Sequence, residues 1–149
     1  MAKGMILAND VFVWNAASHV GPGCQNALAD VQLVQLGYAA LAANPKSGAP
    51  PEDKPVYSAV VVGSTYTGAA NDPLTLAIKR HQQRRGGTQD GRVSPIQSTS
   101  GVYDAAHTWI LVVLSNNIKD VLGANWPHLD RHPKCPPALA AVSKKAFAP

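Results

Sequence analysis

Apolar residues recur at helical spacing in three stretches of the chain, and the first predicts a helix from about Asn26 to Ala43. Asn26 is expected to be its N-cap. Asn44-Pro45 is expected to end it, because the residue before a proline avoids helical geometry. Gly37 in the interior costs about 1 kcal/mol relative to alanine, so we expect a close helix contact there. The apolar stripe of this helix comprises Leu28, Val31, Val34, Tyr38 and Leu41.

The second stretch has the clearest start and stop signals in the sequence. Asp72 is a good N-cap, Pro73 suits the first helical position, and Gly86-Gly87 provides a left-handed C-cap. The chain then turns at Asp90-Gly91, and Arg92-Val93 starts it back. The face expected to be buried comprises Leu74, Ala77, Ile78 and His81, with His81 as a hydrogen-bonded core histidine. The cations expected on the solvated face are Lys79, Arg80, Arg84 and Arg85.

The third stretch predicts a helix over 103–122. Its apolar positions at helical spacing are Ala106, Trp109, Ile110, Val113 and Leu114. Asn116-Asn117 weakens the pattern, so Ile118 to Leu122 is an alternative separate last turn, closed by Gly123.

Two short segments favour β structure. Met5 to Trp14 is compatible with a hairpin that turns at Asn9-Asp10, and Val56 to Gly63 is rich in β-branched residues, as strands are. The second strand is expected to pair with the N-terminal one. Between the first helix and this strand, Lys46 to Pro55 is polar and proline-rich, and it is the best candidate for a mobile segment.

These elements predict a mainly α fold of three helices with a small β element, with an α+β fold as the alternative. Residues 1–125 are expected to form a single domain. Residues 126–149 are expected to be a Pro-rich C-terminal tail, since prolines from Pro127 onward exclude long helices. A short helix at 138–142 is the one regular element expected there.

Composition narrows the class of protein only slightly. A chain of 149 residues with 46% apolar residues is sufficient for one globular core. The formal charge of +4 permits attraction to an anionic polymer. A nucleic-acid binder would usually carry more charge and interleaved aromatic residues, so no nucleic-acid partner is expected. No run is long enough for a membrane span. The apolar run Met5 to Leu7 is too short for a signal peptide, which predicts a cytoplasmic product unless a leaderless route exports it.

The C-terminal part contains four residues whose side chains can bind zinc: His128, Asp130, His132 and Cys135. Pro127 and Pro133 bracket the histidines, so a stable helix that presents both is not expected. We therefore interpret this segment as a solvated tail and expect no metal or other cofactor.

Cys24 precedes a predicted helix, where the helix dipole would favour a thiolate nucleophile. A cysteine amidase would also need a histidine base, either His81 or His107. The flanking Gly23 and Gln25 do not match the D-C-S-G-type motif of such enzymes, so a structural cysteine is favoured. With Cys135, the chain is expected to hold two free thiols. Glu52 is the only glutamate, and no pair of acids suggests glycosidase chemistry.

The order of parts over roughly residues 20 to 115 resembles a small three-helix peptidoglycan-binding domain. Asp30 to Gln35 is similar to the family's first helix, often D-V-x-x-[VL]-Q, and Val20 to Asn26 is similar to its entry loop. The central helix and the D-G-x-V turn of the family match Thr75, Ala77-Ile78, His81-Gln82, Gly86-Gly87 and Asp90-Gly91-Arg92-Val93. His81 stands where the family usually has a buried phenylalanine.

This resemblance implies non-catalytic binding of bacterial cell-wall peptidoglycan, through either its glycan or its stem peptide. The expected site is the groove where the Ser64–Ala70 loop meets the central helix and the turn at residues 90–92. Tyr66 would offer a stacking face, and Asp72, Asp90 and Arg92 would offer polar contacts. Each acid has a structural alternative, because Asp72 also caps the helix and Asp90 also forms the turn.

Two other functions stay open at this stage. The first is a protein-interaction module that reuses the fold: an adaptor, an immunity-type inhibitor, or cargo of a phage or of a contractile (type VI) secretion apparatus. The absence of a signal peptide favours it. The second, less favoured, is a wall amidase that uses Cys24.

Overall fold

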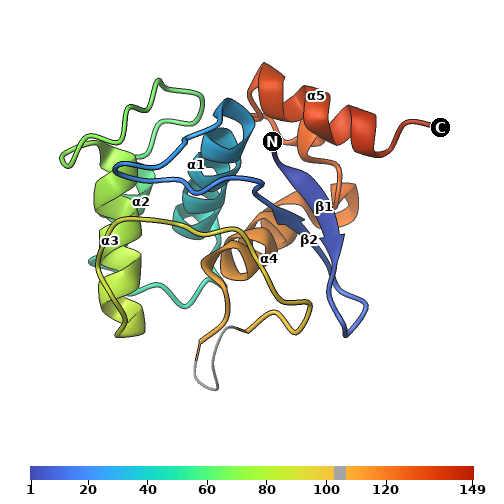
Figure 1. Ribbon diagram of the computed structural model, residues 1–149. Coiled ribbons are helices and arrows are strands. Elements are labelled where there is room, and N and C mark those ends of the chain that lie inside the picture. Colours follow the sequence, from blue (N-terminus) through green and yellow to red (C-terminus); the bar gives the residue numbers. More distant parts are fainter. Residues whose placement is uncertain (103–106) are drawn as a thin grey trace.

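The computed structural model describes residues 1–102 and 107–149. In that part of the chain it is mainly helical with one small antiparallel sheet (Figure 1), as expected. The α-helices are α1 (Leu28–Ala43), α2 (Lys54–Ser58), α3 (Pro73–Arg85), α4 (Ile110–Leu122) and α5 (Pro137–Ala146). The strands are β1 (Lys3–Ile6) and β2 (Phe12–Asn15), and the short 3-10 helices are η1 (Gly123–Asn125) and η2 (Leu129–Arg131). None of the described helices is long and apolar enough to cross a membrane.

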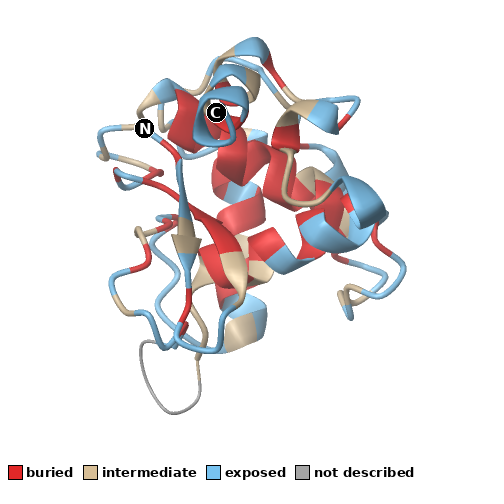
Figure 2. Cartoon of the chain, turned by 90° about the vertical axis from the view of Figure 1, so that its right-hand side faces the viewer, coloured by how far each residue is buried: buried red, intermediate tan, exposed pale blue. Residues whose placement is uncertain are grey.

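The core is organised around α1, which contacts α2, α4 and α5. It lies between the α2–α3 pair and the side that carries the hairpin and α5 (Figure 1). Figure 2 shows that the buried residues gather in these central helices. Because neighbours cover α1 on several sides, its polar Gln32 and Gln35 are buried as well as its apolar residues. Leu28 was expected in the apolar stripe, but it is 62% exposed at the first position of the helix.

Gly37 allows α1 and α4 to approach closely, as the sequence predicts. A Cβ atom at this position would lie 2.7 Å from Cβ of Leu114, well inside van der Waals contact. Both residues are buried. A glycine is therefore needed at this position for the close contact between α1 and α4, although it lowers the helix propensity of α1.

Replacing Gly37 by alanine is expected to destabilise the protein. Overpacking of a close contact costs about 1–3 kcal/mol, which exceeds or cancels the gain of about 1 kcal/mol in helix propensity. Urea unfolding followed by circular dichroism measures the difference. Ala141→Gly, at an exposed position of α5, is the control that reports propensity alone. A Gly37→Ala protein more stable than the wild type would contradict the close contact.

Asn26 is not the N-cap of α1, contrary to the prediction. The cap residue is Ala27, without a side-chain hydrogen bond. Asn26 instead takes a left-handed conformation, with φ of 53°. Its side chain accepts from the Gly21 amide at 2.8 Å and donates to the Gly21 carbonyl at 3.0 Å. The asparagine therefore satisfies loop backbone rather than helix backbone. At the other end, Asn44 is the C-cap, as expected.

The N-terminal hairpin is confirmed. Lys3 pairs with Asn15 and Ile6 with Phe12 in an antiparallel register. The intervening turn contains Asp10 at φ of 64°, a left-handed conformation that aspartate tolerates better than most residues. The sheet is anchored on α4, because the Trp14 amide donates to the Ser115 hydroxyl at 3.0 Å.

The strand predicted from Val56 to Gly63 is wrong, and it does not pair with the hairpin. Its first residues belong to α2, and the rest are turn or loop. The Asp53 carbonyl accepts from the amides of Val56 and Tyr57. Pro55 lies in the first turn, where its missing N–H costs nothing. The Tyr57 ring is buried and stacks on Tyr38, with centroids 5.6 Å apart. Helix start signals and one buried aromatic therefore override the β-branched composition.

The central helix follows the sequence closely. The Asp72 carboxylate accepts from the Leu74 amide at 2.8 Å, and Pro73 is the first helical residue. Gly86 closes the helix in a left-handed conformation at φ of 80°. The expected buried face is confirmed: Leu74, Ala77, Ile78 and His81.

The third predicted helix is shorter than expected. Residues 103–106, including Ala106, lie outside the described residues, and α4 begins at Ile110. It continues without interruption to Leu122, so a separate last turn is wrong, while Gly123 is the C-cap as expected. Asn117 is accommodated because its amide donates to the Val113 carbonyl and its oxygen accepts from the Asn44 side chain.

The C-terminal segment is packed on the core. A helix was expected at 138–142, and α5 contains it. The side chains of Leu129 and Leu139 are fully buried. The Trp14 indole donates to the Pro127 carbonyl at 2.9 Å, and the Leu139 amide donates to Gln32 at 3.1 Å. The interpretation of this segment as solvated is therefore wrong.

Candidate functional site

Two of the residues expected to bind ligand lie near the start of α3. Tyr66 is half-buried, and its hydroxyl is 2.7 Å from the Thr75 hydroxyl. Burial is the main cause that raises the pKa of Tyr66. Asp72 caps the helix through the Leu74 amide. Both side chains thus have structural partners, and their expected role in ligand binding stays a prediction.

The other two expected residues lie on a turn that Gln82 of α3 holds in place. The Gln82 side-chain amide donates to Asp90 Oδ1 at 2.9 Å and to the Arg92 carbonyl at 3.0 Å. Its oxygen accepts from the Gly91 amide at 2.9 Å. A Cβ atom at Gly91 would lie 3.2 Å from Thr75 Cγ2, so Tyr66 and the turn approach the same residue of α3. The structure thus brings Tyr66 and the turn to the same part of α3.

The expected entry loop packs on this turn. Val20 and Val93 form an antiparallel bridge, with the Val93 amide donating to the Val20 carbonyl at 2.7 Å. Gly21 has φ of 142°, and a Cβ atom there would lie 2.5 Å from the Gly91 carbonyl oxygen. The Arg92 Nε donates to the Pro22 carbonyl at 3.0 Å. These contacts fix the orientation of Arg92 with respect to α3.

A cavity of about 270 Å³ lies between the C-terminal end of α3, the turn and the start of α4. Among the described residues, the charged ones that line it are Arg85, Asp90 and Arg92. The other described residues that line it are small, polar or apolar: Gln82, Gly87, Thr88, Ser94, His107, Trp109 and Ile110. Tyr66 and Asp72 do not line this cavity, while Asp90 and Arg92 do. Of the four residues expected to bind ligand, the two on the turn therefore border the cavity, and the two near the start of α3 do not.

Hydrogen bonds connect α3 to the segment just before α4, which also lines the cavity. The Arg85 guanidinium donates through Nη2 to the Thr108 carbonyl, and Nε2 of His107 donates to the Arg85 carbonyl at 3.1 Å. Trp109 is the N-cap residue of α4. From the sequence, Arg85 was expected on a solvated face, His107 was considered only as a base, and Trp109 was considered only as a core residue. In the sequence, the local feature that coincides with this cavity is the basic end of the central helix, followed by Gly86-Gly87.

His81 is a core histidine, as predicted. It is 8% exposed, and its Nδ1 lies 3.0 Å from the Tyr38 hydroxyl. Both Tyr38 and Tyr57 meet its ring edge-on. Burial, followed by the charge of Arg85, lowers the pKa of His81 to about 4, so the imidazole is neutral at pH 7. It fills the place of an aromatic core residue while satisfying one tyrosine hydroxyl.

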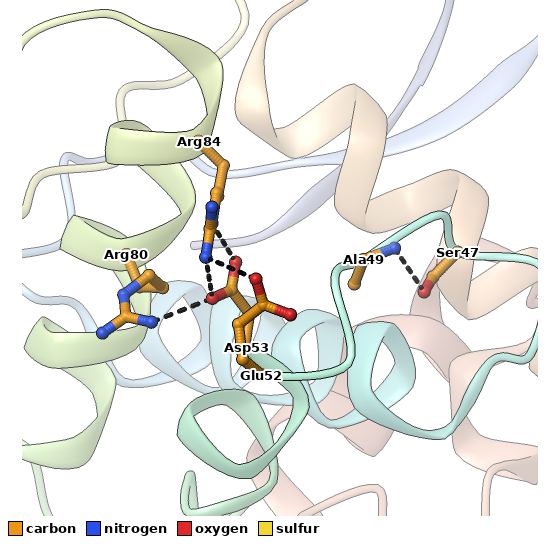
Figure 3. Close-up of polar contacts among 6 residues, drawn as sticks. All are labelled: Ser47, Ala49, Glu52, Asp53, Arg80 and Arg84. Atoms are coloured by element: carbon orange, nitrogen blue, oxygen red, sulfur yellow. Dashed lines mark hydrogen bonds and ion pairs between the residues drawn. The ribbon is translucent and has the colours of Figure 1, made fainter.

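Two of the cations expected on a solvated face form an ion-pair cluster instead (Figure 3). The Asp53 side chain is fully buried, and Arg80 Nη1 donates to it at 2.9 Å. Arg84 donates to the same carboxylate through Nε at 2.6 Å and Nη2 at 2.9 Å, and it also reaches Glu52 at 3.2 Å. The C-terminal end of the proline-rich segment 46–55 is thus attached to α3 through these ion pairs.

The cysteines are free thiols, as expected. Burial is the largest cause that raises the pKa of Cys24, opposed by the charge of Arg92. Its thiol is 3.7 Å from the Pro22 carbonyl. The pKa of Cys135 is raised by burial to about 11. Both shifts favour the thiol over the nucleophilic thiolate.

The residues near the C-terminus that could in principle bind zinc have other partners. His132 Nδ1 accepts from the Lys134 amide at 3.0 Å, and Asp130 accepts from the Ser143 hydroxyl at 2.8 Å. His128 lies against the ring of Phe147. Within 1–102 and 107–149, no group of three or more potential ligands could hold a metal ion.

Comparison of the chain with protein-family models, with curated proteins and with solved structures finds no match.

Proposed function

We propose that this protein is a non-catalytic binder of bacterial cell-wall peptidoglycan and that the cavity beside the turn at residues 90–92 is its binding site. The observation that carries the proposal is the lining of this cavity. Two arginines, one aspartate and Trp109 are among the described residues that line this small cavity. Ligand sites commonly combine apolar walls with a few placed polar groups in this way.

The chemistry of peptidoglycan suits this lining. Its stem peptides carry carboxylates and amines, and its sugars have apolar faces that pack on aromatic rings. Guanidinium groups bind carboxylates in bidentate geometry. The raised pKa of Cys24 supports binding rather than nucleophilic cleavage. The resemblance of the turn and of α3 to a peptidoglycan-binding domain supports the same polymer.

A protein-interaction module is the second candidate, and one observation favours it. Among the described strands, β1 pairs only with β2, so its other edge is unpaired. Ile6 on this strand is 56% exposed. An exposed strand edge can accept a strand from a partner protein, as an adaptor, an immunity-type inhibitor or secretion cargo would require.

We expect purified protein to be retained on insoluble peptidoglycan at two salt concentrations, and not on chitin or cellulose. Arg92→Gln is expected to reduce retention about tenfold, because a charge-assisted hydrogen bond contributes about 1.5–3 kcal/mol. Arg131→Gln is the matched control. It removes the same charge from an exposed position outside the cavity. Circular dichroism confirms that each variant is folded.

Equal loss in both variants, or loss of all retention at the higher salt, would indicate attraction to a basic surface alone. Either result would contradict the proposed site and favour the protein-interaction alternative.

A further inference from the structure

We infer that the cavity recognises a free α-amino acid group, with an ammonium and a carboxylate on one carbon. Within peptidoglycan this chemistry occurs at the side chain of a stem-peptide diamino acid such as meso-diaminopimelate. The inference rests on the proposed function, and it names the part of the polymer that enters the site.

The charges of the cavity are opposite but do not neutralise each other. Asp90 and Arg92 are separated by one residue, and both line the cavity. None of the ion pairs among the described residues involves Arg85, Asp90 or Arg92; all of them are made by Asp30, Glu52 and Asp53. A carboxylate and guanidinium groups held near each other without pairing are complementary to a ligand that carries both charges.

The carboxylate of Asp90 is oriented by one of its oxygens. Oδ1 accepts from the Gln82 side chain and from the Arg92 amide, both at 2.9 Å. No described residue donates to Oδ2. Asp90 is exposed, so Oδ2 is available to accept from a ligand ammonium. The hydrogen bonds on Oδ1 fix the direction in which that acceptor points.

Each of the two guanidinium groups donates one hydrogen bond to a backbone carbonyl, which orients it. Arg92 donates to the Pro22 carbonyl through Nε, and Arg85 donates to the Thr108 carbonyl through Nη2. Each keeps further N–H groups, since a guanidinium carries five donors. Because backbone contacts already hold both side chains, less conformational entropy is lost when they bind a ligand carboxylate.

The size and wall of the cavity favour a single residue over several sugar rings. Its volume of about 270 Å³ is near the lower limit of roughly 300–1,000 Å³ for ligand pockets. Trp109 and Ile110 provide apolar surface beside the charged groups. An aliphatic side chain that ends in a zwitterionic group matches both features.

The test uses isothermal titration calorimetry of the full chain with three stem tripeptides. The first ends in meso-diaminopimelate, the second has lysine in its place and lacks the side-chain carboxylate, and the third is the first with its free amine acetylated. We expect the first to bind about tenfold more tightly than either of the others. Asp90→Asn is expected to remove the preference over the acetylated peptide. This variant keeps an oxygen that can accept from Gln82 and Arg92.

Equal affinity for the three tripeptides, or no binding of the first, would overturn the inference. If peptidoglycan is still retained and Arg92→Gln still reduces retention, only the identity of the bound group is wrong. If the tripeptides are discriminated but peptidoglycan is not retained, zwitterion recognition stands and wall binding fails.

Discussion

Ending the chain after Asn125 is expected to leave the remaining residues largely unfolded. The deletion removes Leu129 and Leu139, whose side chains are fully buried. It also removes the Pro127 carbonyl that accepts from the Trp14 indole, and the Leu139 amide that donates to Gln32. Loss of a buried leucine side chain costs about 2–5 kcal/mol, and each unsatisfied buried polar group costs about 1–3 kcal/mol. The sum is comparable to the entire stability of a small domain, about 5–15 kcal/mol.

Far-UV circular dichroism and a thermal scan measure this effect. The control is a chain that lacks only Ala148 and Pro149, which are exposed and should melt like the full chain. Leu139→Ala is the milder variant, expected to cost about 2–5 kcal/mol in urea unfolding. A shortened chain with a cooperative transition near that of the full protein would show that residues 126–149 are dispensable, as a tail would be.

Replacing Asp53 is also expected to destabilise the protein, through the loss of charged hydrogen bonds rather than of apolar packing. Arg80 and Arg84 donate three hydrogen bonds to this buried carboxylate (Figure 3). Hydrogen bonds to charged groups contribute about 1.5–3 kcal/mol. The arginine side chains are 36% and 42% exposed, so water hydrates them when their partner is lost. We therefore expect Asp53→Ala to cost about 2–3 kcal/mol, less than the roughly 3–5 kcal/mol of a fully buried pair.

The same carboxylate predicts a pH dependence. The hydrogen bond from Arg84 is the main cause that holds the pKa of Asp53 below its usual value; burial opposes it and Arg80 reinforces it. A carboxyl whose pKa is lower in the folded state stabilises the protein above its unfolded pKa, about 3.9. That contribution is lost as the pH falls through the folded pKa.

Asp53→Asn isolates this contribution, because it retains the size of the side chain. The free-energy difference between wild type and variant should be largest at pH 7 and shrink below about pH 4. Urea unfolding at pH 7, 5 and 3 gives the three values. Glu52→Gln is the control, since its side chain is 63% exposed and such pairs contribute little. A difference that is constant with pH would contradict the assigned role.

Local signals were sufficient for some elements and insufficient for others. The N-cap, Pro73 and the Gly86 stop define α3 because each acts through its own backbone geometry. The prediction of a strand from Val56 to Gly63 was wrong, because β-branched residues are favoured by half-buried surroundings and not by strand backbone alone. Neither composition nor spacing shows that Tyr57 stacks on Tyr38. Gly37 was informative because a glycine in a helix interior needs a tertiary reason.

Only some residues of the candidate site could be predicted from the sequence. Asp90 and Arg92 were found because they lie in a recognisable turn that resembles a family motif. Arg85 and Trp109 were not, because the cavity forms only where α4 approaches the end of α3. Lys46 to Pro55 looks like a loop without constraints in the sequence, and only its distant partners Arg80 and Arg84 show that Asp53 is buried.

Two neighbouring residues at the end of α3 have different roles. Arg84 stabilises the fold through Asp53, whereas Arg85 lines the cavity. Thr88 and Ser94 also line it, and they belong to neither the ion-pair cluster nor the buried core. Substitutions at positions 88 and 94 can therefore change the lining of the cavity with little effect on the stability of the fold. A library randomised at these two positions should remain largely folded while its ligand preference diverges, so this scaffold is a good starting point for evolving new recognition.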